Sequence, residues 1–182
     1  FEIPPDWAVF SCGDYGEHNP TWWGLIAVNP DDDVYVIDEY HRSDTGGAEH
    51  ARGVKSLLDG CPYIPGQRPR LNLAPSDMWT KRRPGEANQA LAPSDSFSQE
   101  GIHLTRANMD RVNGWRNLKD LLYAKRLKFF KGRTDHVCAS LTRVQRDPNN
   151  PEDVLKGGDD HAADGLRLGI NHVYKPRKIP QE

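Results

Sequence analysis

The sequence has few of the features that mark disulfide-rich, zinc-binding or membrane-spanning proteins. Only three cysteines occur among 182 residues, they are widely spaced, and no Cys-x-x-Cys pair exists. They are typical of reduced cysteines in a cytosolic protein. No apolar run approaches the roughly 20 residues of a transmembrane helix, and no signal peptide is recognisable. The length suits one domain with a real core. Because the chain opens at Phe1 without a Met, we expect a domain excised from a longer protein.

Lysine and arginine are absent from the first 40 residues, which contain nine Asp or Glu. Residues 111–146 show the opposite bias, with ten Lys or Arg against two Asp, although the net charge of the chain is only −2. This asymmetry is what a protein needs if it holds a metal at one place and a polyanion nearby. The alternative is a basic helix surface with no role beyond solvation.

Hydrophobic periodicity divides the chain into short strands and amphipathic helices. Three strands close in sequence predict an antiparallel meander, over 7–12, 22–28 and 34–40. Later strands are expected over 70–74, 102–104 and 127–130. Helices are expected over 47–59, 109–125 and 135–146, and from 159 or 160 onward. On the 109–125 helix we expect a buried stripe of Val112, Trp115, Leu118 and Leu122.

A meander followed by alternating strands and helices indicates an α/β fold. We expect a mixed sheet, with the antiparallel three-strand meander joined by parallel strands and helices on both faces. In open sheets of this kind, the carboxyl ends of strands gather at one edge and form the reactive crevice.

Acidic residues recur at that expected edge. Asp14 ends the first strand, Asp77 follows the fourth, and Asp160 and Asp164 begin the last helix. Asp160 and Asp164 share one helix face and repel each other unless a cation lies between them. Asp159 or Asp160 can also cap this helix. A capped helix with a solvated acidic first turn therefore stays open as the alternative.

A cluster of carboxylates must either bind cations or shift its pKa values upward. Oxygen ligands of this kind suit Mg²⁺ or Mn²⁺. Two such ions about 4 Å apart would clamp a phosphodiester for in-line attack by water. The acids thus favour metal-dependent phosphodiester hydrolysis.

Several stretches, in their order and approximate spacing, resemble one known family. These are Phe1-Glu2-Ile3-Pro4-Pro5-Asp6-Trp7, Asp14-Tyr15-Gly16 with Pro20, Ala74-Pro75-Ser76-Asp77-Met78-Trp79, Asp110-Arg111-Val112-Asn113-Gly114-Trp115, Asn150-Pro151-Glu152-Asp153-Val154 and Asp160-His161-Ala162-Ala163-Asp164-Gly165-Leu166-Arg167. Together they resemble the nuclease domain of the phage terminase large subunit, which has an RNase H-like fold. The resemblance covers nearly the whole chain.

The resemblance implies a role for each matching residue. Asp14 and Asp77 match the first and second catalytic, metal-binding acids. Asp164 is favoured as the third, with Asp160 beside it, and His161 as an accessory residue that orients a water or approaches the metal. The implied cofactor is Mg²⁺ or Mn²⁺ in a two-metal site. Lys81, Arg82 and Arg83 follow a catalytic acid and are expected to bind the DNA backbone.

The resemblance also implies a biological setting. The family cuts double-stranded DNA concatemers during genome packaging in the host cytoplasm, transiently at the procapsid portal, and requires no membrane. Its partners are an N-terminal ATPase domain of the same polypeptide, the portal protein and the small terminase subunit. No GxxxxGK[ST] loop occurs here, so ATP hydrolysis is not expected of this chain. We expect the nuclease domain over residues 1–174 and a flexible basic tail over 175–182.

Two other interpretations use the same residues. One is a different RNase H-like nuclease, such as a junction resolvase or a transposase core, which cleavage of linear against four-way-junction DNA would distinguish. The other is a non-catalytic module that grips DNA or docks on the portal. Metal-dependent cleavage separates that module from a nuclease.

Overall fold

A mixed six-stranded sheet forms the centre of the computed structural model, which describes residues 1–16, 19–80, 91–155 and 160–176. The described elements follow the order β1 (Ala8–Asp14), β2 (Thr21–Val28), β3 (Val34–Arg42), α1 (Gly47–Gly60), β4 (Asn72–Ala74), the 3-10 helix η1 (Ser76–Trp79), α2 (Pro93–Gln99), β5 (Leu104–Arg106), α3 (Arg111–Tyr123), β6 (Leu127–Phe129), α4 (Asp135–Arg143) and α5 (His161–Val173).

The strands lie in the order β5-β4-β1-β2-β3-β6. Strands β1, β2 and β3 form the predicted antiparallel meander, with Asp14 opposite Trp22 in the register. Strands β4 and β5 continue the sheet in parallel beyond β1, and β6 pairs in parallel with β3. The predicted fold class is confirmed, and β1 occupies the interior of the sheet.

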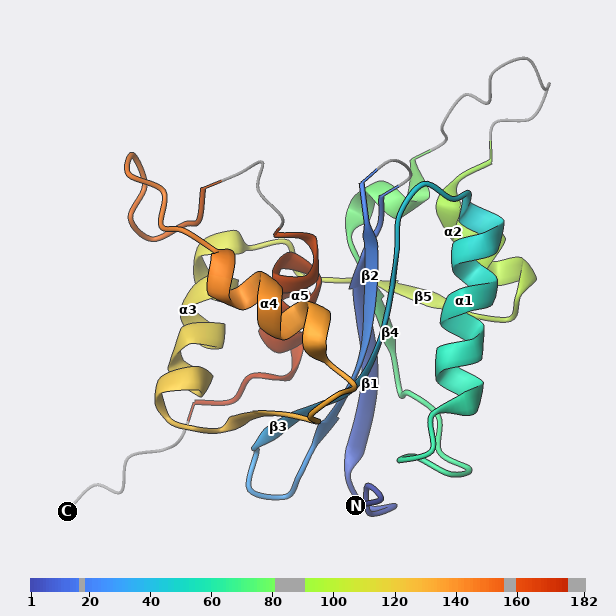
Figure 1. The fold of residues 1–182 in the computed structure, drawn as a ribbon, viewed down its shortest axis with the longest axis horizontal. Helices are drawn as coiled ribbons and strands as arrows, with labels where there is room; N and C mark the ends of the chain where they lie inside the picture. The colour runs from blue at the N-terminus through green and yellow to red at the C-terminus, as the bar shows by residue number, and fades with distance from the viewer. Residues whose placement is uncertain (17–18, 81–90, 156–159, 177–182) are drawn as a thin grey trace.

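Helices cover both faces of the sheet, with α1 and α2 on one side and α3, α4 and α5 on the other (Figure 1). Each side has its own apolar cluster. Trp23 and Phe97 belong to the cluster on the α1 side, and Trp22 and Trp115 to that on the α5 side. The tryptophans therefore serve packing, because their rings are almost completely withdrawn from solvent.

Helix α5 packs against the sheet closely enough to fix the distance between its first turn and β1. A Cβ on Gly165 would lie 2.9 Å from the backbone nitrogen of Asp14 and 2.6 Å from the ring of Trp22. Only a glycine lets the helix come this near. As predicted, Ala163, Leu166 and Ile170 of the same helix are buried.

Most predicted elements are present, but several of their ends differ. The strand predicted over 102–104 is β5 at Leu104–Arg106, because the amide of Ile102 instead closes the turn after α2 on the carbonyl of Phe97. The helix predicted to reach residue 146 ends at Arg143, since Arg146 pairs with Val154 in an isolated bridge. Sequence periodicity did not reveal η1 and α2, which have four and seven residues.

The predicted stripe of α3 was wrong at one position. Leu122 is 42% exposed, whereas Leu121 is 1% exposed and lies in the core beside Leu118. The buried face of α3 includes Gly114. A Cβ at this position would lie only 2.8 Å from the Cγ of Arg167. Close packing on α5 thus rotates the buried stripe toward 114, 118 and 121.

Ion pairs within the fold neutralise part of the charge asymmetry seen in the sequence. Lys128 donates to Asp33 at 2.8 Å, and Arg133 pairs with Asp38. These pairs form because β6, from the basic segment, lies beside β3, from the acidic one. Only part of the basic segment is therefore left for a polyanion.

All three cysteines are free thiols. Within the described parts of the chain, no helix combines the length and apolar character that crossing a membrane would require.

Candidate active site

Asp14 lies at the last position of β1, at the strand edge where the acids were expected to meet. Its carboxylate accepts a hydrogen bond of 2.9 Å from Nδ1 of His161, the first residue of α5. Burial raises the pKa of Asp14, the His161 pair opposes this rise, and the negative charges of Asp164 and Asp77 add to it. The hydrogen bond to Asp14 raises the pKa of His161.

The predicted acids lie close enough to one another for their charges to affect each other's pKa values. Asp14 responds to the charges of both Asp77 and Asp164, and Asp160 to that of Asp164. Asp77 is exposed. The sequence placed it at the end of β4, whereas the structure places it in η1, shortly after that strand. The structure therefore brings together Asp14, Asp77, Asp160, Asp164 and His161.

Asp160 does not cap α5 as predicted. It occupies the N-cap position, but its φ of −107° and ψ of −2° are helical, and its side chain makes no capping hydrogen bond. An extended backbone is needed to direct a cap side chain toward the first-turn amides. Ser140 of α4 instead accepts from the amide of Ala163 at 3.2 Å. The Asp160 carboxylate remains at the site, where burial and Asp164 raise its pKa. Asp159, the other predicted cap, lies outside the described residues.

Asp164 is held by two arginines, whose positive charges offset part of its repulsion of Asp160. NH1 of Arg111 lies 3.0 and 2.9 Å from its two carboxylate oxygens. Nε of Arg167, one turn along α5, lies 2.8 Å from Oδ1. The Arg167 side chain is 2% exposed and the Asp164 side chain 18%. The expected like-charge repulsion is therefore partly compensated within the fold by guanidinium groups.

Arg111 joins the site to the segment that precedes α5. Its Nε donates to both oxygens of Asp153, at 3.1 and 3.3 Å, while NH1 holds Asp164. Burial lowers the pKa of Arg111, but the hydrogen bonds and charges of Asp164 and Asp153 outweigh it, so the net shift is upward. Sequence analysis assigned no role to Arg111, Asp153 or Arg167. The one local signal was an arginine directly after the N-cap of a helix, where a cation opposes the helix dipole.

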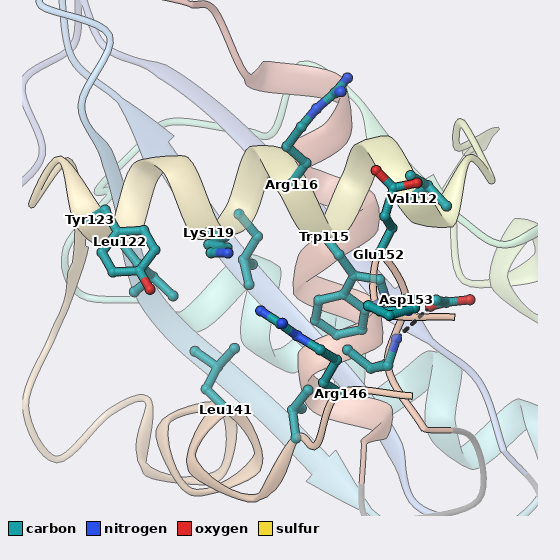
Figure 2. Close-up of a pocket in the computed structure, with 14 residues that line it drawn as sticks. Val112, Trp115, Arg116, Lys119, Leu122, Tyr123, Leu141, Arg146, Glu152 and Asp153 are labelled. Carbon is teal, nitrogen blue, oxygen red and sulfur yellow. Dashed lines mark hydrogen bonds between the residues drawn. The ribbon is translucent and has the colours of Figure 1, made fainter. Parts of the chain in front are cut away.

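A cavity of about 620 Å³ lies between α3, α4 and the 146–154 segment (Figure 2). Its lining includes apolar side chains such as Trp115 and Leu141 and the cations Arg116, Lys119 and Arg146. Two of the lining residues also contact Arg111. Asp153 is its ion-pair partner, and the ring centroid of Trp115 lies 6.0 Å from its guanidinium carbon. The cavity therefore borders the carboxylate site and does not contain it.

The predicted DNA-binding residues Lys81, Arg82 and Arg83 lie outside the described residues. The final part of the predicted tail, 177–182, does as well, and Lys175 near its start contacts Asp32 at 3.1 Å. The DNA contacts and the domain boundary at residue 174 stay predictions.

The donor chemistry of the site fits a hard divalent cation, since four carboxylates from β1, η1 and the start of α5 are coupled through their charges. In the arrangement described here, however, no three His, Cys, Asp or Glu side chains among residues 1–16, 19–80, 91–155 and 160–176 are grouped as metal ligands. Asp14 faces His161 and Asp164 faces two arginines. The residues are suitable ligands whose present partners are cationic side chains.

The sheet order and the helices on both faces define an RNase H-like fold. No family model matches the sequence, and no curated protein matches it. Solved structures do. The large terminase nuclease domain of P22 is 19% identical, with a TM-score of 0.72 over 94% of this chain and 84% of that one.

Two further structures have the same fold. The large terminase of the thermophilic bacteriophage D6E is 19% identical with a TM-score of 0.71, and this chain spans 93% of its own length but 41% of that protein. The g2p large terminase nuclease domain of bacteriophage SPP1, solved with bound Mn, is 16% identical with a TM-score of 0.64, covering 91% of this chain and 86% of that one. The fold is thus shared with large terminase nuclease domains, as the sequence resemblance implied.

Proposed function

We propose that this domain is a divalent-cation-dependent endonuclease that hydrolyses phosphodiester bonds of double-stranded DNA during viral genome packaging. The observation that carries the proposal is the convergence of Asp14, Asp77, Asp160 and Asp164 on one edge of the sheet. Acids this close raise one another's pKa values unless cations compensate them. The fold shared with large terminase nuclease domains supports the same function, as does the Mn bound to the SPP1 domain.

Each acid has a distinct position in the proposed site. Asp14 is the last residue of β1 and Asp77 lies in η1, just after the parallel strand β4, so both would contribute ligands from one edge of the sheet. Asp164 and Asp160 would contribute them from the first turn of α5. When bound, Mg²⁺ or Mn²⁺, in a two-metal arrangement, would activate water and neutralise charge on the scissile phosphate. His161 would hold the Asp14 carboxylate in place through its Nδ1 hydrogen bond.

The wider setting follows from the same proposal. We infer that an ATPase domain belongs to the same polypeptide, because this chain spans only 41% of the D6E large terminase, which has also been solved in complex with ADP. The portal protein and the small terminase subunit would be its partners in the host cytoplasm and at the procapsid portal. Lys81, Arg82 and Arg83 would contact the DNA backbone, so binding would be independent of sequence and sensitive to salt.

A plasmid cleavage assay tests the function directly. We expect cleavage with Mn²⁺ or Mg²⁺ and none with EDTA. Asp14→Asn and Asp77→Asn should each abolish cleavage while leaving the circular dichroism spectrum unchanged, because their charges serve the metal and not the core. Asp6→Asn, at an exposed acid outside the site, is the matched control. Activity of both site variants within a few-fold of the wild type would contradict the proposal, and binding of DNA without cleavage would favour the gripping module.

A further inference from the structure

The two arginines that hold Asp164 differ in how firmly they are fixed. Arg167 is 2% exposed, its Cγ packs against the backbone of Gly114, and its NH1 lies 3.5 Å from the carbonyl oxygen of Asp110. The Arg111 side chain is 24% exposed. Because protein interiors transmit strain and do not yield freely, Arg167 cannot leave without moving α3. The more exposed Arg111 side chain is less confined.

Arg111 also lies at the end of α3 where the helix dipole disfavours a cation. Asp110 caps α3 by accepting from the amide of Asn113 at 3.0 Å, so Arg111 is the first helical residue. A positive charge there is unfavourable with respect to the helix dipole. Its NH2 is buried and has no hydrogen-bond partner among the described residues. A buried donor without a partner destabilises this arrangement further.

The contact between Arg111 and Asp164 occupies the position that a cation would take. NH1 lies almost equally far from the two carboxylate oxygens, at 3.0 and 2.9 Å, and hence between them. Arg167 reaches only Oδ1, from the other direction along α5. A carboxylate has about four lone-pair positions, of which Arg111 occupies one on each oxygen and Arg167 one on Oδ1. Asp164 can therefore keep Arg167 and bind a metal between its two oxygens only if Arg111 withdraws.

We propose that Arg111 is a displaceable positioning residue of the metal site. It holds the Asp164 carboxylate in place and gives up the space between its oxygens when a divalent cation binds, whereas Arg167 keeps its contact. Arg111 then remains tied to Asp153 through Nε, so the exchange needs only a small movement. This inference rests on the proposed function, because it takes Asp164 as a metal ligand.

The inference predicts that removing Arg111 strengthens metal binding, which a purely structural role would not do. We would titrate Mn²⁺ into the protein without DNA by isothermal titration calorimetry. Arg111→Gln should bind Mn²⁺ about three- to ten-fold more tightly than the wild type, because a competing unit charge has been removed. Arg111→Lys should be intermediate, since an ammonium cannot bridge both acids as the guanidinium fork does. Arg116→Gln, on the same helix but away from Asp164, should match the wild type.

Arg167 provides the opposite control. Arg167→Gln should weaken Mn²⁺ binding and lower the melting temperature, because it loosens the fixed support of Asp164. Equal or weaker Mn²⁺ binding by folded Arg111→Gln, with wild-type binding intact, would overturn the inference and leave the proposed function standing. Absence of Mn²⁺ binding in every protein would overturn both. If Arg111→Gln does not fold, wild-type affinity in Arg111→Lys would count against displacement.

Discussion

Two polar clusters lie on opposite faces of the sheet, and they differ in how well their groups are satisfied. On the α1 side, His50 is fully buried between Tyr40 Oη, 3.0 Å from Nδ1, and Thr21 Oγ1, 3.2 Å from Nε2. Thr21 in turn donates to the carbonyl of Gly16 at 2.8 Å. Every contact here is between neutral groups or with the backbone, and burial lowers the pKa of His50.

The α5-side cluster is charged and incompletely satisfied. Its carboxylates have raised pKa values at Asp14 and Asp160, and NH2 of Arg111 and Nε1 of Trp115 are buried without hydrogen-bond partners among the described residues. A neutral cluster would stabilise the fold at least as well, because charged groups lose more hydration free energy when they are buried. The contrast indicates that the α1-side polar groups support the structure, whereas the α5-side groups fit the proposed binding of an ion or substrate.

The largest expected effect separates the two acids of α5. Asp164→Asn should lower cleavage by roughly a hundred-fold or more. It should also lower the melting temperature in EDTA, because the buried Arg167 loses its counter-charge. Asp160→Asn should retain partial activity and an unchanged melting temperature, since its side chain caps nothing. Measuring both quantities for both variants decides between them. A dead Asp160→Asn beside an active Asp164→Asn would assign the third ligand to residue 160.

A second experiment compares the two histidines. His50→Ala should destabilise the domain by about 2–4 kcal/mol, because it leaves a cavity and removes the hydrogen-bond partner of the Tyr40 hydroxyl. His161→Ala, at a partly exposed ion pair, should cost less than about 1 kcal/mol. Urea unfolding in EDTA gives both values. Similar losses in the two variants would remove the distinction between a structural and a functional cluster.

The smallest expected effect is a difference in pH dependence. The pKa of His161 is raised above its usual 6.5, so its stabilising effect is full below pH 6.5 and disappears as pH rises through the raised value. The pKa of His50 is lowered, so that residue instead opposes folding as pH falls below 6.5. The melting temperature of wild type minus that of His161→Gln, measured in EDTA from pH 5.5 to 8.5, should therefore shrink as pH rises. A difference that is constant or grows would contradict the assigned shift.

Local patterns were sufficient for the main elements and for placing the acids near one edge of the sheet. The alternation of apolar and polar residues predicted the meander. The four-residue spacing of two acids at an expected helix start indicated Asp160 and Asp164. Contacts between distant segments could not be predicted this way. Glu39 of β3 accepts from the first amides of α4, at 2.7 and 3.0 Å, and Ser140 of α4 accepts from α5. These distant residues replace the local capping side chains that a sequence motif would reveal.

The partners of Asp164 were missed for the same reason. Arg111 lies 53 positions away from it, and neither residue signals the other in the sequence. Part of the basic segment is not left for a polyanion, because Lys128 pairs with Asp33, just before β3, and Arg133 pairs with Asp38 in β3. Because β6 pairs with β3, which is distant in the sequence, charges that look independent in the sequence form ion pairs in the fold.

The seat of α5 on β1 has a consequence for when the site can exist. His161 and Asp14 are 147 positions apart, and they meet only where Gly165 lets the last helix touch the interior strand. Such distant contacts form late, because the entropy of closing the intervening chain must be lost first. A chain still emerging from the ribosome therefore has Asp14 and Asp77 long before it has their partners from α5. For a protein proposed to cut DNA, completing the fold would be the step that arms it.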